Sequence, residues 1–218
     1  MTKRSWRDRH PLWAGIKQRH MEVYNLTQDA EVFTANAYYI PGEESTLVDV
    51  GSMPGIESEL VSLDAIMLTH QHGDHIGELD TVLDAFPADL YAYRDHPRRT
   101  HEIDDGDSVT IGDTEFEVIY TPGHASDHVV FASDKVLFSG DVVVYNDSAF
   151  SDGSFGRTDR PGQSRERLIR SLETLLDRLP ETVDTMYPGH GDSFSGDVNA
   201  VIERALERAE RREPKYPE

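Results

Sequence analysis

The chain contains no cysteine among its 218 residues. This absence excludes disulfide bonds, thiolate metal ligands and a cysteine nucleophile, and it is compatible with a reducing compartment. Long apolar runs are also missing: none approaches the ~18 residues that a membrane-spanning helix needs, and the basic N-terminus lacks the apolar core of a secretory signal. We therefore expect a soluble, cytoplasmic protein that has no membrane partner.

Basic residues are scarce, with 21 Lys and Arg against 41 Asp and Glu and a formal net charge of −20. Because nucleic-acid binding needs clustered basic side chains that displace counterions, we expect no nucleic-acid partner. Molar salt shortens the Debye length to ~3 Å and screens the repulsion between acidic groups. The charge therefore predicts adaptation to a saline cytoplasm, and an ordinary acidic protein is the alternative.

What the sequence does contain is a dense group of metal-ligand types between Leu68 and Gly77. The donors are His70, His72, Asp74 and His75. Zinc and similar divalent ions take imidazole nitrogens and carboxylate oxygens of this kind. A strand-like run, Leu63–Thr69, precedes the group, and Gly73 permits a sharp turn that brings neighbouring side chains together. The pattern predicts a metal-binding loop rather than a polar loop with scattered histidines.

One loop cannot complete a site for two metals, and three later motifs supply further donors at the ends of strand-like runs. These motifs are Thr121–His124, Ser139–Asp141 and Tyr187–Gly191. Each carries a glycine beside the candidate ligand, which permits a tight turn and a close approach of the backbone. A single Pro-Gly-His is more often only a turn, but the ordered set of four strand-end motifs indicates a metal site.

The ordered set resembles the metallo-β-lactamase-fold hydrolase superfamily over roughly residues 25–191. The resemblance implies an α/β fold, a four-layer αββα sandwich, with residues 1–218 forming one domain and about 192–218 forming a C-terminal helix and a polar tail. It also implies that two divalent metal ions are bound, with zinc expected first and iron or manganese as alternatives. One metal would be held by His70, His72 and His124, the other by Asp74, His75 and His190, and Asp141 would bridge both.

The same resemblance places Asp49 behind the ligands, where it would support the His70–His75 loop; a strand-end turn residue is the alternative. The segment Phe155–Gly162 resembles the corresponding loop of small glyoxalase II-like (hydroxyacylglutathione hydrolase-like) enzymes. This likeness implies that Arg157 binds substrate, whereas a structural salt bridge with Asp152 or Asp159 is the alternative. The spacing of His128 after His124 also resembles glyoxalase II, although an ordinary strand-start histidine is equally compatible.

Two departures from glyoxalase II stand out. Only about 28 residues follow His190, whereas glyoxalase II proper has a C-terminal helical domain that supplies much of its glutathione recognition. Asp159 also stands where that family has an aromatic residue, which puts a glutathione-type contact in doubt.

The function that follows is a metal-dependent hydrolase that cleaves a small thioester by attack of a metal-bound hydroxide, with Asp74 as the catalytic residue that orients it. A thiol with a pKa near ~8.5 leaves without a dedicated general acid, which favours a thioester over an amide. The alternatives are a mononuclear iron persulfide dioxygenase using His70, His124 and Asp141, a lactone or phosphodiester hydrolase, and a non-catalytic binding protein. The expected partner is a small-molecule substrate, and the sequence does not give the oligomeric state.

Apolar periodicity predicts three helices and a series of short strands. The helices are expected at Ile76–Phe86, Ser164–Leu179 and Asp197–Arg211. The strands are expected at His20–Leu26, Val32–Ile40, Thr46–Asp49, Ala65–Thr69, Leu90–Tyr93, Val109–Ile111, Glu115–Tyr120, His128–Ala132, Lys135–Ser139 and Val183–Tyr187.

Overall fold

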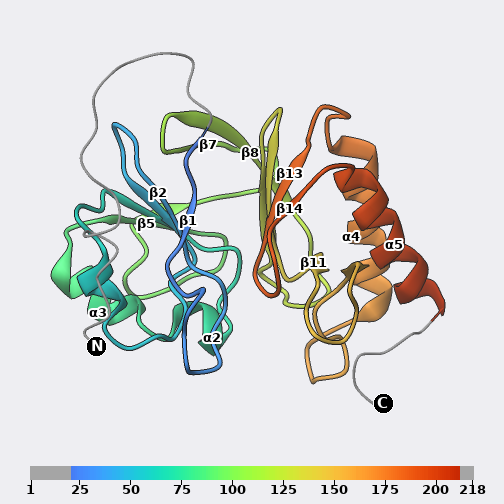
Figure 1. Ribbon diagram of the computed structural model, residues 1–218, viewed down its shortest axis with the longest axis horizontal. Helices are drawn as coiled ribbons and strands as arrows, with labels where there is room; N and C mark the ends of the chain where they lie inside the picture. Colours follow the sequence, from blue (N-terminus) through green and yellow to red (C-terminus); the bar gives the residue numbers. More distant parts are fainter. Residues whose placement is uncertain (1–20, 212–218) are drawn as a thin grey trace.

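Two six-stranded sheets lie face to face, and helices cover the outer face of each, in the computed structural model, which describes residues 21–211 (Figure 1). The expected four-layer αββα sandwich is thereby confirmed. Within residues 21–211, no helix has the length and apolar character needed to cross a membrane.

The first sheet has the strand order β1-β2-β3-β4-β5-β6. Its strands are β1 (Tyr24–Asn25), β2 (Tyr38–Ile40), β3 (Thr46–Val48), β4 (Ala65–Met67), β5 (Asp89–Ala92) and β6 (His101–Glu102). Strands β3 to β6 run parallel to one another, whereas β1 and β2 pair antiparallel. The carboxyl ends of β3 and β4 therefore meet at one edge, which brings Asp49 beside the loop that begins at Thr69.

The second sheet has the order β14-β13-β10-β9-β8-β7. Its strands are β7 (Ser108–Ile111), β8 (Thr114–Tyr120), β9 (Val129–Ala132), β10 (Val136–Gly140), β13 (Thr185–Pro188) and β14 (Phe194–Ser195). Strands β10 and β13 are parallel and pair Gly140 with Pro188, so the loops that follow them leave the sheet together. A small hairpin, β11 (Val144–Tyr145) with β12 (Gly153–Ser154), follows β10.

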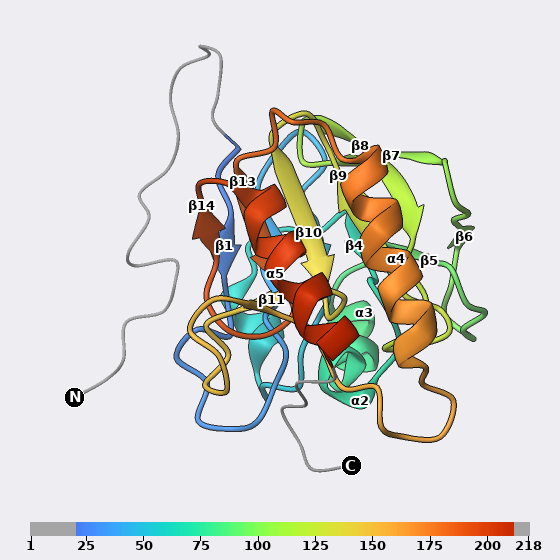
Figure 2. The ribbon, with the colours of Figure 1, turned by 90° about the vertical axis from the view of Figure 1, so that its right-hand side faces the viewer.

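Helices α4 (Arg165–Arg178) and α5 (Val198–Arg211) cover the second sheet (Figure 2). Helix α4 begins after Ser164, whose hydroxyl accepts a hydrogen bond from the Arg167 N–H and so satisfies one of the unpaired donors of the first turn. Its buried residues fall at three- and four-residue steps and join the α5 stripe in one core. The buried residues of the two helices include Leu168, Leu172, Leu175, Val198, Val201 and Ile202.

Helix α3 (Leu79–Ala85) and the short η1 (Ile56–Glu59) cover the outer side of the first sheet, whereas α2 (Gly73–Ile76) lies at the edge of the sandwich (Figure 1). A separate apolar layer fills the space between the two sheets. Its largest fully buried members are Phe116, Phe131 and Phe138, and each stabilises the fold by about 1.5–3 kcal/mol relative to an exposed side chain.

The helices expected at Ser164–Leu179 and Asp197–Arg211 agree with α4 and α5 to within one residue at each end. The helix expected at Ile76–Phe86 is confirmed over Leu79–Ala85, but its expected start is wrong, because the chain forms α2 and α3 with a break between them. At this break the Glu78 N–H donates to the Gly51 carbonyl instead of continuing the α2 hydrogen bonds.

The strand expected at Val32–Ile40 is also wrong in its first part, since only Tyr38–Ile40 joins the sheet. The preceding residues send their backbone N–H groups to two loops at the sheet edge rather than to a neighbouring strand. The strand expected at His20–Leu26 is limited to Tyr24–Asn25, and His20 lies outside the described residues. Strands β6, β11, β12 and β14 have two residues each, too few to show a periodic pattern.

Candidate metal centre

Seven side chains from four loops converge at one edge of the sandwich. Their ligand atoms form three groups, and within each group all atoms lie within 4.8 Å of one another. The groups are His70, His72 and His124; His70, His75 and Asp141; and Asp74, His75 and His190. The structure thus brings together every residue that the sequence predicts as a metal ligand, although their separation along the chain is large.

The first group is the tightest. The His72 Nδ1 lies 3.0 Å from the His70 Nε2 and 2.8 Å from the His124 Nε2. Asp141 lies between this group and the others, because its Oδ2 is 3.3 Å from the His124 Nε2 and its Oδ1 is 3.4 Å from the His75 Nε2. A carboxylate with two oxygens can serve two metals in this position, which an imidazole cannot do.

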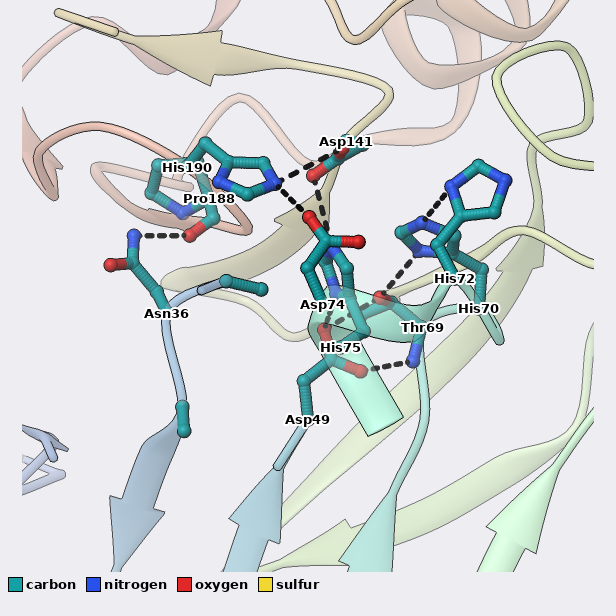
Figure 3. Close-up of polar contacts among 12 residues, drawn as sticks. Asn36, Asp49, Thr69, His70, His72, Asp74, His75, Asp141, Pro188 and His190 are labelled. Atoms are coloured by element: carbon teal, nitrogen blue, oxygen red, sulfur yellow. Dashed lines mark hydrogen bonds and ion pairs between the residues drawn. The ribbon is translucent and has the colours of Figure 1, made fainter. Parts of the chain in front are cut away.

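The third group joins the two sheets at the same edge. Asp74 stands in the first turn of α2, and its Oδ2 lies 3.1 Å from the Nε2 of His190, which follows β13 (Figure 3). The His190 Nε2 is also 3.6 Å from the Asp141 Oδ2. His75 is completely buried, whereas Asp74 and His190 each expose 23% of their side chains. Asp74 and His190, together with the half-buried His72, are therefore the ligands that solvent reaches.

The ring protons of three histidines point away from the cluster. The His124 Nδ1 donates to the Arg157 carbonyl at 2.8 Å, and the His75 Nδ1 donates to the Asp49 Oδ2 at 2.8 Å. The His70 Nδ1 donates to the Thr69 hydroxyl at 3.2 Å, because that hydroxyl gives its own proton to Asp49. Each ring therefore turns an Nε2 lone pair towards the centre.

The imidazole and carboxylate lone pairs that converge at the centre have few hydrogen-bond donors among their neighbours, and this arrangement fits a bound cation. The His75 Nε2 and the Asp141 Oδ1 are buried polar atoms without a hydrogen-bond partner among the described residues. Such orphaned groups are costly unless a ligand satisfies them. Imidazole nitrogens and a carboxylate in this arrangement suit zinc or iron, so the donor set fits two divalent ions.

The charges of the cluster also suit metal binding. Burial lowers the pKa of His124 to about 4 despite the nearby Asp141, so this ring is neutral at pH 7. Burial and the neighbouring histidines lower the pKa of His70 well below its usual value. Burial tends to raise the pKa of Asp141, but the surrounding histidines outweigh it and hold this pKa well below its usual range. At His75 and His190 burial tends to lower the pKa, but the neighbouring carboxylates outweigh it and raise the pKa of both rings, so a bound metal would have to displace a proton there. The neutral rings of His70 and His124 and the ionised carboxylate of Asp141 are already in the protonation states that ligate metals.

Asp49 supports the His70–His75 loop from behind. Its Oδ1 accepts the Thr69 N–H at 2.9 Å, and its Oδ2 accepts both the Thr69 hydroxyl at 2.7 Å and the His75 Nδ1 proton. Asp49 also has a positive φ of 53°, so it turns the chain at the end of β3 as well. Thr69 was not singled out in the sequence, although its place directly before His70 is the signal that could have identified it.

His128 is fully buried next to the centre and holds the main chain of a ligand residue. Its Nε2 accepts the Asp141 N–H at 2.9 Å, so its Nδ1 carries the proton and donates to the Thr121 hydroxyl at 2.8 Å. The sequence left the role of this histidine open. The structure places it behind Asp141, where it fixes the backbone of the residue between the metal groups.

Arg157 contributes its main chain to the centre through the bond from His124. Its guanidinium is bound by both oxygens of Asp159, at 2.9 Å from Nε and 2.7 Å from the second terminal nitrogen. Asp152 instead pairs with Arg204 and Arg208 of α5. Substrate binding by Arg157 stays a prediction, and the structure shows which carboxylate a substrate would compete with.

Comparison with known proteins agrees with this geometry. A family model described as the metallo-beta-lactamase superfamily matches residues 30–100 and 89–190. Over 79 residues the chain is 43% identical to a hydroxyacylglutathione hydrolase from Francisella philomiragia subsp. philomiragia, which covers 35% of this chain and 31% of that protein. The chain therefore spans about a third of the length of that curated relative.

Two solved structures share the fold. ETHE1 from Myxococcus xanthus is 23% identical, with a TM-score of 0.69 over 87% of this chain and 84% of its own, a likeness of fold alone. TTHA1623 in a di-iron-bound form is 27% identical, with a TM-score of 0.60 over 78% of this chain and 93% of its own. Because the family model matches most of the sequence, the chain belongs to the metallo-β-lactamase superfamily.

Proposed function

We propose that this protein is a dinuclear metal hydrolase that cleaves a small thioester. The observation that carries the proposal is the inward-facing set of seven donors, in which Asp141 stands between two groups of ligands. The local likeness to a hydroxyacylglutathione hydrolase supports a thioester as the substrate. Zinc is the proposed metal, and the di-iron form of TTHA1623 makes iron the first alternative to test.

The residues divide the chemical work. Two bound ions would supply Lewis acidity for the scissile carbonyl and lower the pKa of a water held between them. Asp74 is the catalytic residue in this proposal, because its carboxylate lies at the open side of the cluster and can accept a hydrogen bond from the attacking water. Asp141 keeps the two groups of ligands in register, since it contacts both of them.

The proton positions favour a good leaving group. His70 and His124 are neutral, and their ring protons are already donated away from the centre. Neither ring can protonate a departing amine, so hydrolysis of an amide would be slow. A thiolate, the conjugate base of a thiol with a pKa near ~8.5, departs at neutral pH without that proton.

Arg157 is proposed to bind a carboxylate or the thioester carbonyl of the substrate. A guanidinium can grip a carboxylate through two parallel hydrogen bonds, and Asp159 already occupies Arg157 in this way. A substrate carboxylate would therefore have to displace Asp159.

The experiment that tests the proposal combines metal analysis with a substrate panel. Protein purified without chelator is assayed in high salt against a small thioester, a lactone and a phosphodiester. We expect two equivalents of metal, turnover of the thioester, and loss of turnover after chelation that added Zn²⁺ restores. One equivalent of iron together with oxygen uptake on a persulfide would instead identify a mononuclear dioxygenase and overturn the proposal.

The charge of the chain motivates a second part of the proposal, that the protein functions in a saline cytoplasm. In this proposal its partners are small-molecule substrates and not nucleic acids or membranes. A net charge of −20 makes mutual repulsion of surface carboxylates a large term, which salt screens. The midpoint of thermal unfolding should rise steadily as NaCl increases from about 0.01 to 1 M. Full stability in salt-free buffer would contradict this part of the proposal.

A further inference from the structure

The segment Thr34–Asn36, just before β2, connects the first sheet to two ligand loops. The Ala35 N–H donates to the carbonyl of Asp74 at 3.1 Å, and the Asn36 N–H donates to the carbonyl of Gly189 at 2.7 Å. Two consecutive backbone donors therefore hold the loops that carry Asp74 and His190. These are the hydrogen bonds that a continuous β2 strand would have used within the sheet.

The side chain of Asn36 adds a second pair of bonds around His190. Its Nδ2 donates to the Pro188 carbonyl at 2.9 Å (Figure 3). The same Nδ2 donates to the Gly191 carbonyl at 3.0 Å. Its Oδ1 accepts the Asn25 Nδ2 at 2.9 Å, which fixes the orientation of the amide. One residue of the first half of the chain thus binds the backbone before and after His190.

The backbone of the His190 loop is also held by its other neighbours. The Gly189 N–H donates to the Gly140 carbonyl at 2.8 Å, and a Cβ at Gly189 would collide with Asp141 and meet the His75 ring at 2.8 Å. The loop passes this point only as bare backbone. Two side chains tie it to the first sheet: the Tyr38 hydroxyl donates to the Pro188 carbonyl at 2.8 Å, and the Asn36 amide binds a carbonyl on each side of His190.

The contacts of Asn36 are confined to one side of the centre. Asn36 and its neighbour bind the backbones that carry Asp74 and His190, which belong to one ligand group. The rings of the other group are held by different partners: the Thr69 hydroxyl for His70 and the Arg157 carbonyl for His124. A change at Asn36 should therefore affect the two metal positions unequally.

We propose that Asn36 is a positioning residue that sets the affinity of the Asp74–His75–His190 metal position while leaving the His70–His72–His124 position unchanged. The inference rests on the proposed dinuclear function. Partners that lie behind metal ligands typically change metal affinity by about 10- to 100-fold when they are removed. We expect an effect of this size on one of the two ions only.

The test is a titration of metal-free protein with Co²⁺, followed by calorimetry and by the visible absorption of the bound ion. Wild-type protein is compared with Asn36→Ala and with the matched control Asn199→Ala on α5. Wild type and control should bind two equivalents, whereas Asn36→Ala should bind the first with unchanged affinity and the second about 10- to 100-fold more weakly. If Asn36→Ala does not fold, Asn36→Ser, which cannot span both carbonyls, carries the same expectation.

The outcomes separate the inference from the function on which it rests. If Asn36→Ala weakens the binding of both ions equally, or leaves both affinities unchanged, Asn36 has no selective positioning role, while the dinuclear centre still stands. Binding of one equivalent by the wild-type protein would refute the dinuclear function and the inference with it. Because the readout is the difference between two affinities in one protein, a general loss of stability cannot imitate the expected result.

Discussion

The two halves of the sandwich build their share of the metal centre in different ways. The first half supplies four donors within the six residues from His70 to His75, on the loop after β4 and in the short helix α2 that follows it. The second half supplies His124, Asp141 and His190 from the ends of β8, β10 and β13. The first set is gathered by one local turn, whereas the second depends on the register of a whole sheet.

The supports of the two sets differ accordingly. In the first half, the buried carboxylate of Asp49 accepts three hydrogen bonds, and that of Asp127 accepts the Gln71 N–H. In the second half each ligand has its own partner: the Arg157 carbonyl holds the His124 ring, His128 holds the backbone of Asp141, and Asn36 holds the backbone around His190. In the first half one residue, Asp49, therefore serves several groups at once, whereas each ligand of the second half has a different partner.

The largest effect is expected from two single variants, each of which removes one metal ligand from one half of the sandwich. Loss of a residue behind a metal ligand lowers activity by about 10- to 100-fold. His72→Ala and Asp141→Ala should each lower turnover by more than this, because a direct ligand is lost. Both variants should stay folded by circular dichroism, since neither fills the apolar core. Thioester turnover near the wild-type rate in either variant would refute the assignment of that half.

Asp49→Ala should have the next largest effect, and it should act on the whole first loop. The change leaves the Thr69 N–H, the Thr69 hydroxyl and the His75 Nδ1 without their acceptor, at about 1–3 kcal/mol for each buried donor. We expect a lower midpoint of urea unfolding and weaker binding of both ions in a Zn²⁺ competition assay. Unchanged Zn²⁺ affinity would show that the loop holds its shape without Asp49.

His128→Phe should affect one ligand of the second half and should therefore cost less. The variant removes the acceptor of the Asp141 N–H, which lowers the free energy of unfolding by about 1–3 kcal/mol and weakens metal binding less than Asp49→Ala does. His128→Gln, whose side-chain oxygen can accept the same proton, should restore most of the affinity. If the Phe and Gln variants bind metal equally, this hydrogen bond has no part in positioning Asp141.

The smallest effect is expected at the rim, where Asp159→Asn weakens the ion pair with Arg157. Partly exposed pairs contribute about 0.2–1 kcal/mol, so KM for a thioester that carries a carboxylate should fall by up to about five-fold. KM for a neutral thioester serves as the control and should not change. Equal shifts for both substrates would count against Arg157 as the carboxylate anchor.

Much of the centre could be predicted because its donors occur in an ordered set of short motifs, although a later motif taken alone would indicate only a turn. The density of histidine and aspartate from His70 to His75, and the glycine beside each of the later ligands, indicate a metal site through residue type and spacing alone. Helices α4 and α5 were likewise predictable, since their apolar stripes repeat over many residues. Two-residue strands such as β6 and β14 carry no such repeat and could not be found.

The supporting residues were harder to predict because their types have many ordinary uses. An asparagine such as Asn36 or a threonine such as Thr69 is usually a turn or strand residue, and only its three-dimensional neighbours give it a role at the centre. The range Val32–Ile40 shows the same point. Its pattern is typical of a strand, but only Tyr38–Ile40 joins the sheet, and the residues before it bind two ligand loops.

The sequence by itself determined the chemical type of the donors, their order along the chain and the two long helices, because ligand chemistry and apolar periodicity are local properties. The layered α/β architecture was expected from the resemblance of the ordered motifs to a known family. The tertiary structure decided which lone pairs face one another, which partner takes each ring proton, and that Asp159 occupies Arg157. Those features depend on strand register and on contacts between residues far apart in sequence, such as Asn36 with Pro188, and short-range patterns do not encode them.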